Sequence, residues 1–559
     1  MTNLIYPRAP VTIGLVVAGV LLFFGIGAIA SLIFAPTSIQ TPTSADQSIL
    51  AALASSVDRN RLFYSLKSAG VQASLSVFFS ILIAIPAAIT VSRRPTWMFG
   101  LGMQGLVMLI SLAMVLPSTV AAMGLLAVWG RNGAVAGLCG SLCGDFSIYG
   151  LHGVVLAHMM LNVPLVMRVM IPLLNAVHQS KWRNSALLGL STWGRFQHIE
   201  WPQIRGVIPG LASLIFMLCF TSFALVLMLG GGPKVTTLEV EIYGAVRFDF
   251  NLLAAAGLSL IQFGIMALVV AVFAFWGGWH ASGDIRTPNN PLPRPDLTAT
   301  DRIWDIAVLS GVIFLVALPV VMVAIRGMND EILTLLTRPQ FFAAAKASFT
   351  VAMITAVVVT TLSLVMAYAK ASLSLSHRHR NMPYASLLRV ILDQGVLLYL
   401  VIPSVVLGTA AFIVLRGLGD VFGYAFAVVV MANTLLTLPF AYRLLERRLT
   451  GILAQHDRLA VQLGIMGISR IKILTLPALR QDLGLVAGLT AALSIGDLGV
   501  IALFANADFR TLPWLLYQLS GKYAADEAAA LAFVLMIVTV AFFWLGRVLL
   551  SRLLGGRYA

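Results

Sequence analysis

The sequence predicts an all-helical protein that crosses a membrane many times. Of its 559 residues, 59% are hydrophobic and 11% are charged, whereas about 25% of residues are charged in an ordinary soluble domain. The mean hydropathy of +0.93 agrees with this class. Apolar runs of about 20 residues recur along the chain, and each can cross a hydrocarbon layer about 30 Å thick. A soluble enzyme, a nucleic-acid-binding protein and a secreted disulfide scaffold are therefore poor fits.

A polar segment near the middle of the chain divides the apolar runs into two sets. Residues 280–302 contain four prolines together with Asn, Asp and Thr, a composition typical of an extended linker. We predict that this cytoplasmic linker joins a first transmembrane half, residues 1–279, to a second half, residues 303–559. About twelve spans are expected, at residues 11–34, 65–91, 100–128, 149–174, 206–229, 252–278, 303–325, 345–369, 387–415, 422–444, 484–505 and 526–550.

Basic residues are concentrated in alternate loops. Lys and Arg number 37 against 22 Asp and Glu, for a formal net charge of +15. In a soluble chain this excess would suggest a nucleic-acid partner, but here the basic residues lie in short loops between apolar runs, where they set orientation. Arg93, Lys181 and Arg447 belong to one set of loops, while Glu239 and Glu241 lie in the opposite, mixed or acidic set. We expect both termini to be cytoplasmic and no nucleic-acid partner.

Only three cysteines occur in the chain. Cys139 and Cys143 lie in a Gly-rich loop and could form a disulfide or could simply be small neutral residues. The second interpretation is favoured, because nothing else in the sequence resembles a disulfide framework.

The two halves repeat each other most clearly in the long basic loop after the fourth apolar run of each half. Gly189 precedes Pro202 by 13 positions, and Gly464 precedes Pro477 by the same distance. The offset between the copies is 275 residues; it holds in the preceding run and slips to 274 further downstream. A match that continues through a loop and its flanking runs indicates a tandem duplication.

Each repeated loop has the pattern of two short helices that meet at a bend. An amphipathic stretch leads to a Gly, and a short polar segment then ends at a Pro. We call residues 183–202 the first elbow and residues 458–477 the second elbow. Such an elbow fits a cleft on a soluble partner, or it rests on lipid headgroups. One copy in each half favours a two-fold partner.

The elbows resemble the EAA motif of ATP-binding cassette (ABC) importer permeases, in which a Gly is followed by Ile-x-Leu-Pro. The motif positions are Arg183, Gly189, Ile199, Trp201 and Pro202 in the first elbow, and Arg458, Gly464, Leu474, Leu476 and Pro477 in the second. The chain departs from the motif at its start, where Arg replaces the usual Glu in both copies. The resemblance implies that the elbows are coupling loops, which dock on two copies of a cytoplasmic ABC ATPase.

Two further stretches, which begin at Leu214 and Leu493, resemble the thiamine and thiamine pyrophosphate permeases. This resemblance covers nearly the whole chain. It implies a type I ABC importer permease in the bacterial inner membrane, which receives thiamine or its phosphates from a periplasmic thiamine-binding protein. A fused permease for ferric iron or another small solute is the alternative within transport.

The energy source is expected to lie outside this chain. The sequence has no GxxxxGK[ST] loop to hold ATP phosphates, so the resemblance places ATP and magnesium on the partner ATPase. We predict that the chain is not an enzyme and binds no cofactor or metal of its own. An ATP-independent secondary transporter is a further alternative, but such a protein needs paired ionisable groups within its spans, and these spans have almost none.

Asp497 is the exception, because it lies inside an apolar run. An acid there is costly unless it faces a cavity or a partner. It either lines the substrate pathway, where a carboxylate would suit the positive thiazolium of thiamine, or is a structural acid bonded to Ser494 or a neighbouring helix. The repeat offset places Ser222 opposite it, so the first half has no matching acid. These three residues are the candidate pathway residues.

Overall fold

A computed structural model of the chain describes residues 8–35, 53, 55–93, 112–113, 115–131, 133–135, 147–232, 235–275, 299–380, 384–465, 467–522 and 524–553. The regular elements in these ranges are all helices. Nine of them are long and apolar enough to cross a membrane, or up to 11 when two bent pairs are each counted as one span. The prediction of an all-helical, multi-pass membrane protein is confirmed. Cys139 and Cys143 lie outside the described residues.

The first half contains long helices separated by short ones. Its elements are α1 (Arg8–Ile33), α4 (Arg59–Arg93), α7 (Ser118–Trp129), α9 (Leu151–Asn175), α10 (Gln179–Leu187), α11 (Thr192–Arg195), the π-helical turn η3 (Phe196–Glu200), α12 (Trp201–Ile204), α13 (Ile208–Phe220), α14 (Ala224–Leu229), α15 (Leu238–Arg247) and α16 (Leu252–Phe275).

The second half follows the same order. Its elements are α17 (Ala299–Gly327), α18 (Glu331–Thr337), α19 (Pro339–Arg380), α20 (Ala385–Leu397), the 3-10 turn η5 (Leu398–Leu400), α21 (Ser404–Leu418), α22 (Ala425–Gln462), α23 (Gly467–Arg470), the π-helical turn η6 (Ile471–Thr475), α24 (Leu476–Gly496), α25 (Gly499–Phe504), α26 (Leu512–Gly521) and α27 (Ala525–Leu553).

Three of the expected spans are not single straight helices. The run at 206–229 is broken between α13 and α14, and the run at 484–505 is broken between α24 and α25. The run at 387–415 turns by 94° before α21, because Pro403 has no backbone N–H and disfavours helix in the residue before it. The expected span at 100–128 lies largely outside the described residues, and its end forms α7.

The duplication predicted from the elbows is visible in the short elements. α11, η3 and α14 have the same lengths as α23, η6 and α25, which follow them by 275 residues. α15 and α26 match at an offset of 274. The boundaries of the halves and of the linker stay predictions, since residues 280–298 lie outside the described ranges. The last residues of the expected linker are helical, because α17 begins at Ala299.

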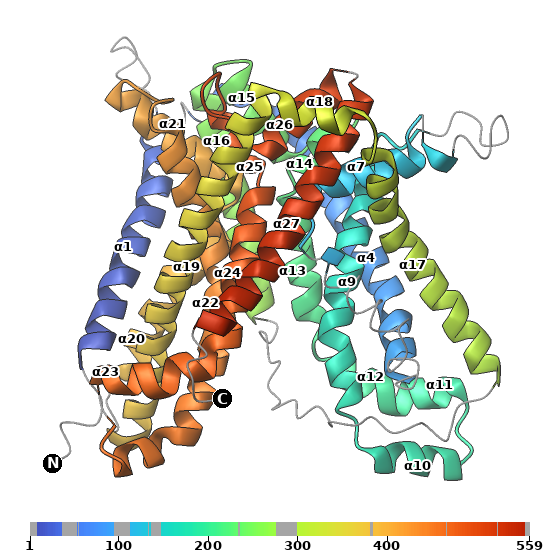
Figure 1. Cartoon of the computed structure of the whole chain (residues 1–559), viewed down its shortest axis with the longest axis vertical. Coiled ribbons are helices and arrows are strands. Elements are labelled where there is room, and N and C mark those ends of the chain that lie inside the picture. Colours follow the sequence, from blue (N-terminus) through green and yellow to red (C-terminus); the bar gives the residue numbers. More distant parts are fainter. Residues whose placement is uncertain are drawn as a thin grey trace.

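The first helix of each half packs against the other half. α1 contacts α19, α20 and α21, and α17 contacts α4, α7 and α9. The Tyr399 hydroxyl, for example, donates a hydrogen bond to the carbonyl of Leu21 over 2.6 Å. Two groups of helices result, one with α1, α19 and α22 and one with α4, α9 and α17 (Figure 1). They diverge toward the end that carries the elbows, while α14, α15, α25 and α26 lie toward the opposite end (Figure 1).

Candidate functional site

The first elbow is two short helical segments joined through a left-handed glycine. After α10, Gly189 has φ +62°, a conformation that glycine adopts without steric cost. The Ser191 hydroxyl then accepts a hydrogen bond from the Gly194 amide over 3.2 Å and caps α11. Pro202 lies in the first turn of α12, where no backbone N–H is needed. The predicted bend between short helices is therefore present.

The second elbow has the same left-handed glycine turn, but the helix that leads into it differs from that of the first elbow. Gly464 has φ +68°, and Pro477 lies in the first turn of α24. The segment before the glycine is the end of the 38-residue helix α22 and not a separate short helix. The side chain of Arg458 lies outside the described residues, so its predicted role stays a prediction.

Most of the described motif residues are accessible to a partner. Ile199 is buried, and it packs with Trp182 and Val177 in a small apolar cluster beneath the first elbow. The side chain of Trp201 is 36% exposed, and its ring lies 5.9 Å from that of Phe196. The remaining described positions are the exposed Arg183, Gly189, Pro202, Gly464 and Pro477 and the half-buried Leu474 and Leu476.

Large apolar side chains project from both elbow regions into solvent. Leu187 and Trp193 are 86% and 70% exposed beside the first elbow glycine. Leu463 and Ile473 are 64% and 63% exposed on either side of the second elbow glycine. Exposed apolar groups gathered among charged ones mark an interaction surface.

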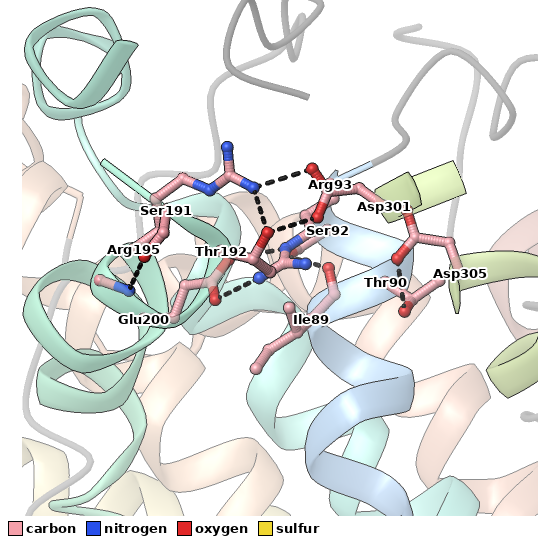
Figure 2. A network of polar contacts seen from close by, with 11 residues as sticks. Ile89, Thr90, Ser92, Arg93, Ser191, Thr192, Arg195, Glu200, Asp301 and Asp305 are labelled. Carbon is pink, nitrogen blue, oxygen red and sulfur yellow. Dashed lines mark hydrogen bonds and ion pairs between the residues drawn. The ribbon is translucent and has the colours of Figure 1, made fainter. Parts of the chain in front are cut away.

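A buried ion pair fastens the first elbow to the end of α4 (Figure 2). The Arg93 guanidinium donates from Nε and Nη2 to the two carboxylate oxygens of Glu200, over 2.9 and 2.8 Å. The side chains are 4% and 0% exposed. A two-point pair of this kind fixes both direction and distance, so η3 is held against α4.

A second ion pair fastens the same elbow to the other half (Figure 2). Arg195 donates from Nη2 to Asp301 over 2.8 Å, and the Thr192 hydroxyl donates to the same carboxylate over 2.7 Å. One turn further along α17, Asp305 accepts a hydrogen bond from the Thr90 hydroxyl over 3.0 Å. The start of the second half is thus bonded to the first elbow.

In the second half, a different set of ionic contacts joins the helices near the elbow. The Lys370 ammonium lies 2.8 Å from Asp393 and 3.1 Å from Glu446. The Tyr442 hydroxyl also donates to Asp393, over 2.7 Å. These contacts tie α19, α20 and α22 together, whereas the first-half network runs through the elbow itself.

The candidate pathway residues do not form one cluster. Asp497 lies in the break between α24 and α25, where its Oδ1 accepts a hydrogen bond from the Gly499 amide over 3.3 Å. Ser222 is half-buried in the corresponding break between α13 and α14. Ser494 is bonded to Asn433 instead, over 2.9 Å. Asp497 is thus bonded to the start of the neighbouring helix α25 and not to Ser494, and both its pathway role and its structural role stay predictions.

Glu239 differs most from the sequence prediction. The sequence predicts it in an external loop, but it lies in α15 with 0% exposure. Its Oε1 accepts a hydrogen bond from Gln262 Nε2 in α16 over 3.1 Å. Burial raises the pKa of Glu239 well above its usual range, the charge of Asp497 raises it further, and the Gln262 bond opposes both. An acid from the first half therefore does lie near Asp497.

Comparison with known proteins identifies the family. No family model matches the chain. It is 35% identical over 476 residues to the thiamine transport system permease protein ThiP of Brucella abortus (strain 2308), covering 84% of each chain. Identity to the protein of the same name from Escherichia coli K12 is 34%, over 84% of this chain and 85% of the relative. For that of Haemophilus influenzae it is 31%, over 85% and 86%. The chain therefore belongs to the family of thiamine transport system permeases.

Proposed function

We propose that this chain is the permease subunit of an ABC importer that moves thiamine or its phosphates from the periplasm to the cytoplasm. The observation that carries the proposal is the pair of elbows, with glycine turns at matched positions in a chain of this family. Repeated exposed surfaces suit a partner that is itself two-fold. The permease supplies the pathway and is not the enzyme of the system.

Two copies of a cytoplasmic ABC ATPase dock on the elbows and bind ATP and magnesium. Leu187 and Trp193 near Gly189, and Leu463 and Ile473 near Gly464, supply the apolar contact, because their burial in a cleft removes apolar area from water. The ion pairs of Arg93 and Arg195 transmit a push on the first elbow to α4 and α17. A rigid connection is needed here, since a loose elbow would absorb the movement.

The elbow end faces the cytoplasm of a bacterial cell, and the opposite end meets a periplasmic thiamine-binding protein. Positive residues gather at the elbow end, as the positive-inside rule requires. α1 begins and α27 ends toward that end (Figure 1), which supports a cytoplasmic position for both termini. The chain is thus a multi-pass protein of the inner membrane, with its outer surface contacting lipid.

Asp497 and Ser222 line the pathway from equivalent breaks in the two halves. A helix break leaves backbone polar groups free, and such irregular backbone is tolerated at membrane depth where it lines a cavity or is covered by protein. The carboxylate of Asp497 offers the positive thiazolium ring an attractive partner. Ser494 accepts a hydrogen bond from Asn433 and so holds α24 against α22 next to the pathway.

Uptake by cells tests this proposal. The chain is co-expressed with its ATPase and binding protein in cells that lack their own thiamine importer, and radiolabelled thiamine is supplied. Accumulation should require a working ATP site in the ATPase. Uptake that persists without that site would support a secondary transporter, and a complex that hydrolyses ATP but ignores thiamine would point to another solute.

A further inference from the structure

Two acids from different halves lie on elements that pack together toward the end of the molecule away from the elbows. Glu239 belongs to α15, and Asp497 lies in the break between α24 and α25. α15 packs against α21 and α25, and α16 packs against α21. Arg247 of α15 bonds across the same boundary, donating to the carbonyl of Ala505 over 3.1 Å. The two acids therefore lie at the contact between the halves.

Neither acid is neutralised by a positive side chain within the described part of the protein. Glu239 Oε2 and Asp497 Oδ2 are buried and have no hydrogen-bond partner there, and no ion pair reaches them. Gln262 is 0% exposed, and its Oε1 is also unpartnered while its Nε2 bonds to Glu239. Buried polar groups without partners are costly. These unpartnered oxygens, on helices that pack together, suit a positive ligand.

Two aromatic side chains, those of Tyr243 and Phe223, lie beside the first-half part of this cluster. Tyr243 follows Glu239 by one helical turn, on the same face of α15. Its ring lies 5.3 Å from that of Phe223, next to Ser222 in the first-half break. Burial, with the nearby Tyr517, raises the pKa of Tyr243 to about 12, so this tyrosine stays neutral. Neutral aromatic rings attract a delocalised organic cation.

We propose that Glu239, Asp497 and Gln262 form a binding site for the positively charged ring of an organic cation, closed in this structure. The proposal rests on the proposed function, which makes that cation the thiazolium of thiamine. Glu239 has no exposure and Asp497 retains some. Separation of α15 from α21 and α25, as the halves rock, exposes both carboxylates to a cation arriving from the side opposite the elbows.

Charge-removing substitutions test the site in the full complex with its ATPase and binding protein, reconstituted in liposomes. Glu239→Gln and Asp497→Asn should each lower the initial rate of radiolabelled thiamine uptake by about tenfold. Glu239→Asp keeps the charge and should recover a clear part of that loss. Glu241→Gln, on the same helix and hydrogen-bonded to Thr236, is the matched control and should stay within twofold of the unmodified protein.

Uptake within twofold of the unmodified protein in both charge-removing variants would overturn the site. So would equal losses in Glu239→Asp and Glu239→Gln, because a structural role depends on shape and not on charge. Failure of the unmodified complex to transport thiamine while it hydrolyses ATP would instead overturn the proposed function. The two failures are therefore distinguishable.

A labelling experiment decides the case if a charge-removing variant does not assemble. Asp497→Cys is made in a chain whose three cysteines are replaced by serine, and a positively charged thiol reagent is added outside the vesicles. The rate of labelling should rise when the complex is trapped with ATP and vanadate, and excess thiamine should slow it at least fivefold. Labelling that thiamine does not slow would contradict a substrate site at this position.

Discussion

Replacing Arg93 or Glu200 alone with methionine leaves the other charge buried without its partner. The two groups are 2.8 Å apart at their closest; at an effective dielectric constant near 20 their attraction is about 6 kcal/mol. Desolvation costs several kcal/mol per ion and offsets much of this attraction. Each single variant should therefore lose about 3–5 kcal/mol of unfolding free energy, mostly from the stranded charge.

The double variant Arg93→Met/Glu200→Met should be more stable than either single variant, because it strands no charge. Equilibrium unfolding of the four proteins in mixed detergent micelles gives the double-mutant cycle. Strict additivity of the two single effects would refute the reasoning, since it would mean that the two side chains do not interact. Restored stability without restored uptake would show that the pair positions the elbow in addition to stabilising the fold.

Three further predictions concern the elbows and the junction of the halves. The double variant Gly189→Ala/Gly464→Ala forces alanine into left-handed backbone, at a cost of about 1–2 kcal/mol per site. The number of thiamine molecules transported per ATP hydrolysed should fall, and an unchanged number would argue against a coupling role. Leu187→Asp with Leu463→Asp places charges in the apolar contact and should abolish co-purification of the ATPase, whereas persistent binding would place the docking surface elsewhere. When the chain is cut within residues 282–296 and the halves are co-expressed, the second half retains Asp301 and should assemble with the first. A second half that starts at residue 303 lacks Asp301 and should be recovered with the first half in lower yield. Equal yields would make the Asp301 contact unimportant.

Matched controls accompany these variants. Gly206→Ala is a glycine substitution close to the first elbow, at a position with open space around the added carbon and without a left-handed backbone. It should leave coupling unchanged. Leu333→Asp places the same charge on an exposed leucine of α18, at the end opposite the elbows (Figure 1). It should leave ATPase binding unchanged.

The elbows could be predicted because their signals are local. A glycine that needs φ above zero and a proline that starts a helix are both readable from a short stretch. Recurrence of the same glycine–proline pair at one offset in both halves then argues against a chance match. The structure has the left-handed turn at each glycine and the matching short helices α11 and α23.

The ion-pair network could not be predicted because its partners are distant in the sequence. Arg93 and Glu200 are separated by 107 residues, and Arg195 and Asp301 by 106. In the sequence, Arg93 and Arg195 are each explained as residues that orient the chain in the membrane, and Asp301 lies at the end of the expected linker. Packing of α4 against the first elbow brings Arg93 to Glu200, and packing of α17 against the first half brings Asp301 to Arg195.

Glu239 was misplaced for a related reason. α15 has 10 residues, too few to cross a bilayer, so an external loop was the natural expectation. The hydrophobic pattern of such a short helix does not reveal that neighbouring helices bury Glu239 completely. The breaks at Ser222 and Asp497 were likewise hidden inside continuous apolar runs.

Directional transport by the purified complex tests the central claim most directly. The chain and its ATPase are reconstituted in liposomes, with thiamine-loaded binding protein on one side and ATP only on the other. The account predicts accumulation of thiamine on the ATP side, in complexes whose elbows face the ATP. Thiamine movement that needs no ATP, or accumulation on the side of the binding protein, would contradict it.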